Sequence, residues 1–190
     1  MEEKIKNESS NIKNTDQKLK VLNLFAYTGI ASLVAAKEGC EVTHVDASAP
    51  SIAWARENQQ ASNLVDKPVR FIKEDVLKYC QREVRRGHKY DCLIMDPPVY
   101  GHGPNGEVWD FKKSFPQLLS VCKNLLVNNP LFIIINAYAV SASALMLKNI
   151  LADYTRDLNG KIEVGELCLE EKAHKRLLST GIFARWSCYS

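Results

Sequence analysis

The stretch Val21-Leu-Asn-Leu-Phe-Ala-Tyr-Thr-Gly29 decides the fold, together with Val45-Asp46 and Asp96-Pro97-Pro98 further along the chain. The first stretch has the form of an apolar strand and a turn with one glycine, and a helical pattern follows it. We expect Thr28 to cap that helix and Ser48 to cap the helix after the second motif. The second motif ends a strand on an acid, and the third ends a later strand on an acid and two prolines. Because the carboxyl ends of parallel strands meet at one edge of a sheet, the three motifs predict a single site there.

Strands and helices alternate along the chain, which predicts a parallel sheet because parallel neighbours need helical crossovers. The expected parallel strands are 20–26, 41–46, 69–73, 90–96 and 131–136. Two further strands, 161–169 and 181–187, have no helical pattern between them, so we expect a hairpin with one antiparallel strand. The predicted fold class is α/β: a doubly wound, mostly parallel, seven-stranded, Rossmann-like sheet that ends in a C-terminal antiparallel hairpin.

Composition indicates one globular domain. The chain has 190 residues, of which 46% are hydrophobic and 25% charged, and its net charge is +3. Residues 1–19 are polar and lack a sustained period, so we expect a disordered leader there and a folded domain over residues 20–190. No apolar run is long enough to span a membrane, which favours a cytoplasmic protein.

The six cysteines contain no Cys-x-x-Cys pair, and several fall within apolar patterns. We therefore interpret them as buried, reduced thiols and expect no metal site.

The predicted cofactor site lies after the first three strands. Gly29 allows the backbone to approach a ligand, and the helix that follows offers free N–H groups to a carboxylate. Asp46 can accept both hydroxyl protons of a ribose, and Asp75 can accept from an adenine amino group or simply cap a helix. A pyrophosphate normally requires Gly-x-Gly-x-x-Gly, and this turn has one glycine. The pattern therefore favours S-adenosylmethionine (SAM) over a dinucleotide, with Trp54 as a helix-packing residue rather than an adenine platform.

The predicted reaction site is Asp96-Pro97-Pro98. Its two prolines fix an extended turn whose carbonyl oxygens can accept hydrogen bonds from an amino group and align it for methyl transfer. Tyr100 can stack on a flat substrate such as an extruded base. The glycine-rich loop that follows is expected to form a lid, with His102 as a possible substrate contact. Trp109 is expected either to stack on a base or to anchor the lid.

These motifs, together with Ala55-Arg56-Glu57-Asn58 and Gly181–Trp186, resemble the class I 23S ribosomal-RNA methyltransferases that modify cytosine C5 or guanine N2. The resemblance covers residues 20–186 and implies a SAM-dependent methyltransferase domain that acts on RNA. It implies a cofactor site formed by Asn23, Phe25, Tyr27, Thr28, Gly29, Asp46, Ala47, Ser48, Asp75 and Val76. It also implies a methyl-acceptor site formed by Asp96, Pro97, Pro98 and Tyr100.

Two departures from this group shape the expected chemistry. The C5 enzymes use a cysteine just beyond the fifth strand, where this sequence has Ile135-Asn136-Ala137-Tyr138. A nitrogen acceptor is therefore favoured, with Asn136 and Tyr138 as candidate lining residues. Members also normally carry a segment before the first strand, so a truncated or split form is a further possibility.

Three functions remain open at this stage: an RNA nitrogen methyltransferase, a methyltransferase for a protein or small molecule, and a SAM-binding module that is inactive without another segment. Basic residues that could meet RNA phosphates cluster at 82–89 and again at 172–176, where acids at 170 and 171 dilute the charge. The sequence does not predict the oligomeric state.

Overall fold

The structure is a computed structural model that describes residues 18–138 and 142–188. Within these residues, a seven-stranded sheet has the order β3-β2-β1-β4-β7-β9-β8. Its strands are β1 (Lys20–Leu24), β2 (Glu41–Asp46), β3 (Val69–Lys73), β4 (Cys92–Met95), β7 (Phe132–Ala137), β8 (Lys161–Glu170) and β9 (Leu177–Ser187). The first five run parallel, and β9 is antiparallel to both of its neighbours. The predicted fold class is confirmed.

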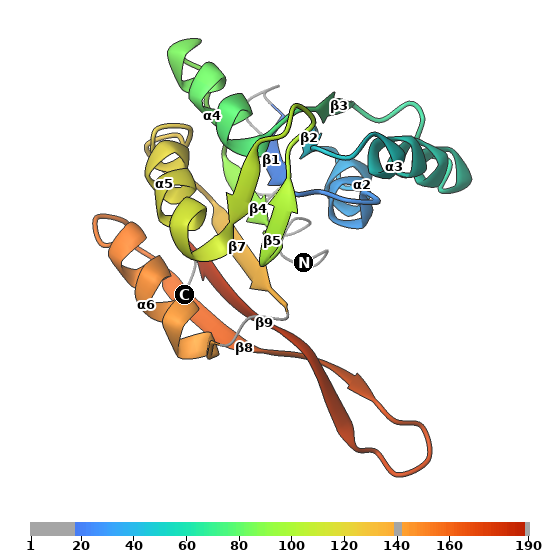
Figure 1. Ribbon diagram of the computed structural model, residues 1–190, viewed down its shortest axis with the longest axis vertical. Helices are drawn as coiled ribbons and strands as arrows, with labels where there is room; N and C mark the ends of the chain where they lie inside the picture. The colour runs from blue at the N-terminus through green and yellow to red at the C-terminus, as the bar shows by residue number, and fades with distance from the viewer. Residues whose placement is uncertain (1–17, 139–141, 189–190) are drawn as a thin grey trace.

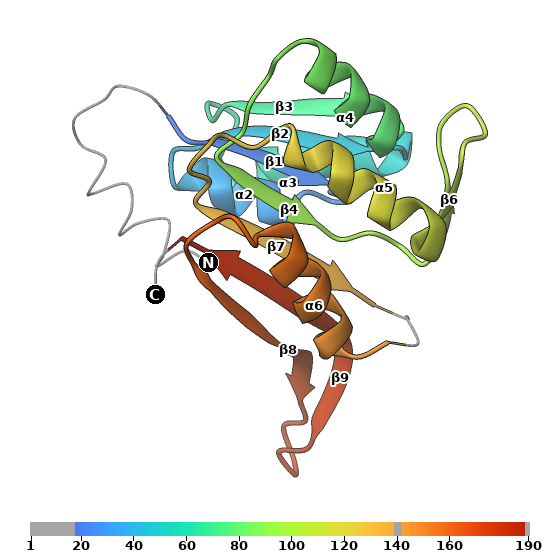
Figure 2. The same cartoon turned by 90° about the vertical axis from the view of Figure 1, so that its left-hand side faces the viewer.

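Helices cover both faces of the sheet (Figures 1 and 2). On one face lie α2 (Ile30–Lys37) and α3 (Ala49–Ala61), and on the other lie α4 (Val76–Arg85), α5 (Phe111–Lys123) and α6 (Ala144–Tyr154). Since side chains alternate across a strand, β1 contributes side chains to the hydrophobic cores on both faces of the sheet. Leu22 and Leu24 pack in the larger core on the α4–α6 side, and Val21 packs in the smaller core on the α2 side.

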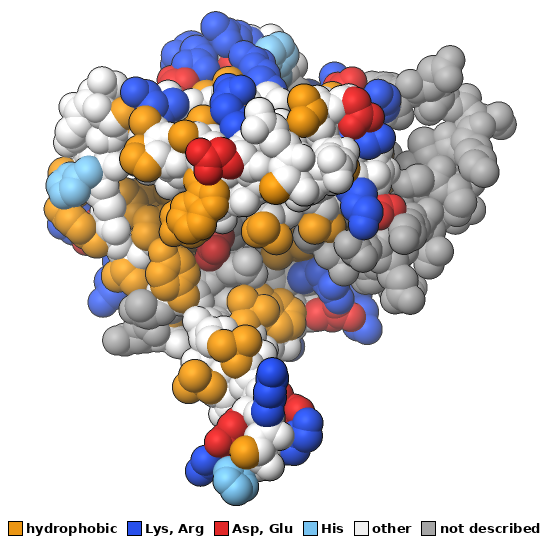
Figure 3. Space-filling model, turned by 90° about the vertical axis from the view of Figure 1, so that its right-hand side faces the viewer, with side chains coloured by type: hydrophobic (Ala, Val, Ile, Leu, Met, Phe, Trp, Pro, Cys, Tyr) orange, Lys and Arg blue, Asp and Glu red, His pale blue; other side chains and the backbone are white. Residues whose placement is uncertain are grey.

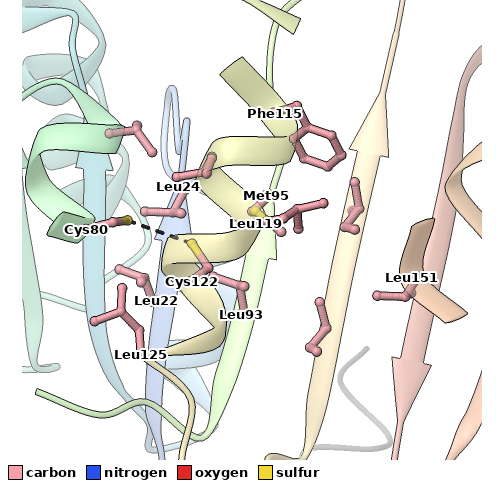
Figure 4. Close-up of a cluster of buried hydrophobic side chains, with 14 of the residues drawn as sticks. Leu22, Leu24, Cys80, Leu93, Met95, Phe115, Leu119, Cys122, Leu125 and Leu151 are labelled. Carbon is pink, nitrogen blue, oxygen red and sulfur yellow. Dashed lines mark hydrogen bonds between the residues drawn. The ribbon is translucent and has the colours of Figure 1, made fainter. Parts of the chain in front are cut away.

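The larger core contains two of the cysteines (Figure 4). Cys80 of α4 and Cys122 of α5 are fully buried, and their sulfur atoms lie 3.9 Å apart. The contact with Cys122 and burial raise the pKa of the Cys80 thiol well above its usual value. Cys40 and Cys92 are also buried, as expected for packed thiols, whereas Cys168 is exposed.

Three local expectations were wrong. The loop after Asp96-Pro97-Pro98 contains a short antiparallel hairpin, β5 (Tyr100–His102) and β6 (Val108–Asp110). Helix α2 is capped by Gly29, whose φ of 88° is left-handed, and not by the side chain of Thr28. Strand β9 begins at Leu177, four residues before the predicted start, because its first residues pair only with β8.

The extra length of β8 and β9 forms a two-stranded arm that projects from the sheet (Figures 1 and 2). Strand β7 pairs with β9 only from Ile182 onward, so the arm extends past the carboxyl end of β7. Its exposed apolar side chains are Leu167, Leu169, Leu177 and Leu178. Near its tip, Lys175 pairs with Glu170 and Arg176 pairs with Glu171, each at 2.7 Å. These ion pairs neutralise much of the predicted basic cluster at 172–176.

Candidate functional site

The turn after β1 is held in an unusual backbone conformation. Phe25 and Tyr27 have φ of 56° and 47°, a left-handed region that costs a non-glycine residue about 1–2 kcal/mol. Two bonds to β2 offset this strain: Ala26 N donates to Val45 O at 3.1 Å, and Tyr27 N donates to Asp46 Oδ2 at 2.8 Å. The turn is therefore shaped by the neighbouring strand rather than by its own residues.

Asp46 ends β2 with both carboxylate oxygens engaged by backbone. Besides Tyr27 N on Oδ2, Ser48 N donates to Oδ1 at 2.8 Å. Each oxygen keeps a lone pair for a further donor, so the carboxylate is fixed in orientation and can still accept two hydroxyl protons. Ser48 caps α3 as predicted, accepting from Ser51 N at 3.3 Å.

Asp75 caps a helix, as the sequence suggested, and it also lines the candidate cavity. Its Oδ1 accepts from Lys78 N at 2.9 Å and caps α4. The residue also lines the same cavity as Asp46, beside buried Val76. Because the cap uses one carboxylate oxygen, the other remains available to a ligand.

Asp96 follows β4 and is half-buried, and burial raises the pKa of its carboxyl group. Within the described parts of the chain, no donor bonds to this carboxylate. The next two residues are Pro97, which is buried, and Pro98, whose carbonyl oxygen accepts from Trp109 Nε1 at 2.7 Å. The expected outward carbonyl at Pro98 thus already accepts one hydrogen bond from within the chain.

The β5–β6 hairpin forms a wall beside this motif and has two anchors. At its base, Trp109 is only 6% exposed, and its ring centroid lies 4.7 Å from that of Phe25. The side chain therefore anchors the hairpin rather than offering a free stacking surface. Toward its tip, Glu107 Oε1 lies 2.5 Å from Lys78 Nζ of α4, and this pairing lowers the pKa of Glu107 to about 2.

Together these elements enclose a cavity of about 470 Å³ at the carboxyl edge of the sheet. Hydrophobic side chains gather around a hollow on this face, above the projecting arm (Figure 3). The predicted site residues that line the cavity are Phe25, Tyr27, Asp46, Ala47, Ser48, Asp75, Val76, Asp96 and Pro98. It is also lined by Ser51, Gly101, His102, Gly103, Trp109 and Tyr138. Of these, Ser51, Gly101 and Gly103 could have been predicted as site residues only from their position next to predicted motifs.

Five predicted site residues do not line the cavity: Asn23, Thr28, Gly29, Pro97 and Tyr100. The structure corrects the expected direct role of Asn23, because its side chain is buried and donates to Ser32 Oγ at 2.9 Å. The carbonyl of Thr28 accepts from Asn58 Nδ2 at 2.9 Å.

Two exposed aromatic side chains contact residues that line the cavity. Tyr100 is 57% exposed and makes an edge contact with His102, their ring centroids 5.3 Å apart. Trp54 was expected to pack within its helix, but it is 53% exposed and its ring lies edge-on to Tyr27 at 6.3 Å.

A second cavity, of about 380 Å³, lies at the opposite, amino-terminal edge of the sheet. It is lined by Lys20, Glu41, Val42, Thr43, Pro68, Val69, Arg70, His88, Lys89 and Tyr90. Ligands of open α/β sheets bind beyond the carboxyl ends of the strands, and the cavity with Asp46, Asp75 and Asp96 lies there. We therefore assign the functional site to the carboxyl edge.

Within residues 18–138 and 142–188, no cluster of three or more His, Cys, Asp or Glu side chains could hold a metal ion. Over the same ranges, no helix has the length and apolar character needed to cross a membrane.

Comparisons with known proteins identify a family model and a solved structure that resemble this chain. A family model described as S-adenosylmethionine-dependent methyltransferase matches residues 7–157. The crystal structure of a SAM-dependent methyltransferase from Agrobacterium tumefaciens is 43% identical with a TM-score of 0.89, covering 98% of this chain and 60% of that chain.

Curated relatives are longer than this chain. Ribosomal RNA large subunit methyltransferase I of Aeromonas salmonicida is 30% identical over 82% of this chain and 39% of its own length. Ribosomal RNA large subunit methyltransferase K/L of Shewanella oneidensis is 37% identical over 58% of this chain and 15% of its own length. The chain thus spans less than half the length of these curated relatives.

Proposed function

Since the chain belongs to the S-adenosylmethionine-dependent methyltransferase family, we propose that its carboxyl-edge cavity binds SAM and that it transfers the methyl group to RNA. The observation that carries this proposal is the shared cavity of Asp46 and Asp96. The first carboxylate is oriented by two backbone N–H groups at 2.8 Å, and the second is half-buried without a donor from the described residues. Asp46 is thus suited to bind the ribose hydroxyls, and Asp96 is suited to bind the group that accepts the methyl.

The residues present fit the cofactor. Asp46 would accept from the two ribose hydroxyls, and Asp75 would accept from the adenine amino group beside Val76. The N-terminus of α2, which begins directly after Gly29, would face the methionyl carboxylate. The cavity has no phosphate-binding glycine motif, which favours this cofactor over a dinucleotide. When bound, SAM supplies a methyl group on a positively charged sulfur.

The reaction side of the cavity offers positioning and a proton acceptor. The rigid turn at Pro97 and Pro98, tied to Trp109, would hold an acceptor nitrogen at a fixed distance from the cofactor. Burial raises the pKa of Asp96, so its carboxylate is a better base than an exposed aspartate. We assign to Asp96 the binding of the acceptor N–H and the removal of its proton.

A nitrogen acceptor fits the site better than C5 of a pyrimidine. C5 transfer requires a thiolate that attacks the ring, and within the described residues no cysteine lines the cavity. Cys92 on β4 is fully buried, as is Cys122. In place of a thiol, Tyr138 lines the cavity and is 46% exposed.

RNA is supported by the names of the relatives and by the aromatic mouth of the site. Exposed Tyr100 and Tyr138 could stack on a base brought out of a helix, a mode of recognition that tolerates any sequence. The basic clusters give less support, since Arg82 pairs with Glu74 and Arg176 pairs with Glu171. The RNA backbone would therefore meet few unpaired cations at these positions.

Two other functions keep specific support. A methyltransferase for a protein or small molecule is consistent with the modest net charge of +3. A SAM-binding module that needs a further segment is consistent with the match to only 60% of the Agrobacterium chain. We propose that the methyltransferase domain extends over residues 20–190. The segment expected to be a disordered leader, 1–19, falls outside the described residues at 1–17. A cytoplasmic location stays a prediction.

The proposal is tested by incubating the purified chain with methyl-labelled SAM and ribosomal RNA that lacks modifications. Label should enter the RNA, and nucleoside analysis should find it on a base nitrogen. Asp96→Asn should abolish incorporation while still binding the cofactor. Label on C5 of a pyrimidine would refute the nitrogen assignment, and label on added ribosomal protein but not on RNA would refute the substrate class.

A further inference from the structure

A chain of buried polar side chains lies directly beneath the turn after β1. Asn23 of β1, Ser32 of α2 and His44 of β2 are each at most 2% exposed. Asn23 Nδ2 donates to Ser32 Oγ at 2.9 Å, and Ser32 Oγ lies 3.0 Å from His44 Nδ1. Buried polar groups are costly unless they are paired, and this chain links three elements that meet at the cofactor turn.

His44 is neutral in the folded protein. Burial is the main cause, and nearby Arg56 adds to it, so that the pKa of His44 falls to about 4. A hydrogen bond with the backbone of Tyr27 raises the pKa of His44, so a peptide group of the turn lies next to the imidazole. The buried Nε2 atom of His44 has no well-aligned hydrogen-bond partner among the described residues.

The imidazole also touches the turn at its glycine. A Cβ on Gly29 would lie 3.4 Å from His44 Cε1 and 3.0 Å from Ala55 Cβ. The ring is backed on β3 by Phe71, with ring centroids 5.0 Å apart. The turn therefore rests on His44, and His44 is fixed from the side by Ser32 and from behind by Phe71.

We infer that His44 is a positioning residue for the cofactor, held in place by Ser32 and Asn23. It acts by keeping Phe25, Tyr27 and Gly29 in their left-handed backbone conformation, with Tyr27 N bonded to Asp46 Oδ2. This inference rests on the proposed SAM site, and it assigns a role to three residues that do not line the cavity. Asn23 thereby acts on the cofactor indirectly.

The test compares the dissociation constant of S-adenosylhomocysteine, the demethylated product, between wild type and variants by calorimetry. His44→Phe keeps a ring but removes both nitrogens, and Ser32→Ala removes the hydroxyl that joins the chain. Each should weaken binding by about tenfold or more, because the turn loses its support. His44→Asn, which places an amide near the former Nδ1, should recover much of the loss.

A matched control separates positioning from general stability. The variant Val42→Ala changes a residue on the same strand and face as His44, two residues toward the amino edge, that is buried in the smaller core. It should lower Tm by an amount similar to that of His44→Phe and leave the dissociation constant unchanged. Backbone hydrogen exchange without ligand gives a second measure, since the amides of Tyr27 and Gly29 should exchange faster in His44→Phe but not in Val42→Ala.

The possible outcomes are distinct. If His44→Phe and Ser32→Ala bind like the wild type, or no more weakly than Val42→Ala at equal Tm, the positioning role is wrong and the SAM site stands. If the wild type itself does not bind the ligand, the proposed function fails and this inference fails with it. Unchanged exchange at Tyr27 and Gly29 in His44→Phe also overturns the inference, whatever the ligand does.

Discussion

Replacing Asp46 by alanine should loosen the turn after β1 and weaken binding of the cofactor. The carboxylate accepts from Tyr27 N and Ser48 N at 2.8 Å, and hydrogen bonds to a charged group are each worth about 1.5–3 kcal/mol. The proposed ribose would add two more such bonds. Taking the lower value for each, because the site is open to water, gives about 3 kcal/mol of lost binding. That loss corresponds to a dissociation constant about 150-fold higher.

The assay is calorimetric titration with S-adenosylhomocysteine, accompanied by a thermal melt to show that the variant is folded. Asp91→Ala is a matched control, since Asp91 also accepts a backbone N–H, from Lys20 at 2.8 Å, but lies at the opposite edge of the sheet. The control should bind like the wild type. A folded Asp46→Ala protein with wild-type affinity would refute both the ribose contact and the support of the turn by Asp46.

Three further predictions concern the reaction side of the cavity. Because burial raises the pKa of Asp96, the folded state favours its protonated form and stability falls as pH rises through that pKa. The urea midpoint of unfolding should therefore be higher for Asp96→Asn than for the wild type at pH 7, but not at pH 3. Equal midpoints at pH 7 would contradict this reasoning. Trp109→Phe loses the bond to Pro98 O and should cost about 1–3 kcal/mol in urea unfolding, whereas no change would mean that the carbonyl finds another donor. Lys78→Met removes the partner that lowers the pKa of Glu107 to about 2, so the amides of Gly103, Asn105 and Gly106 should exchange hydrogen faster at pH 7. This difference should vanish as pH falls from about 4 toward 2.

The centre of the sheet was predictable because strands such as β1 and β4 are buried on both faces. A strand such as Cys92–Met95, covered by helices on each side, gives a continuous apolar run that is easily recognised. The acid at the end of such a run then falls at the carboxyl edge by topology alone, which is why Asp46, Asp75 and Asp96 were found. The terminal hairpin followed from the lack of a helix between its strands.

What the sequence missed depends on tertiary contacts. The left-handed conformation of Phe25 and Tyr27 is imposed by β2, and no local propensity of these aromatic residues indicates it. The β5–β6 hairpin lies in a glycine-rich stretch that resembles a loop, and it is fixed by Trp109 on Phe25. Asn23 has the residue type of a ligand contact, but in the folded chain its side chain is buried and donates to Ser32 Oγ.

The most direct test of whether the carboxyl-edge cavity is a cofactor site is calorimetric titration of the unmodified chain with S-adenosylhomocysteine. We predict one site per chain with a dissociation constant in the micromolar range, lost in Asp46→Ala and kept in Asp91→Ala. The absence of binding by a chain that circular dichroism shows to be folded would contradict the assignment of this cavity.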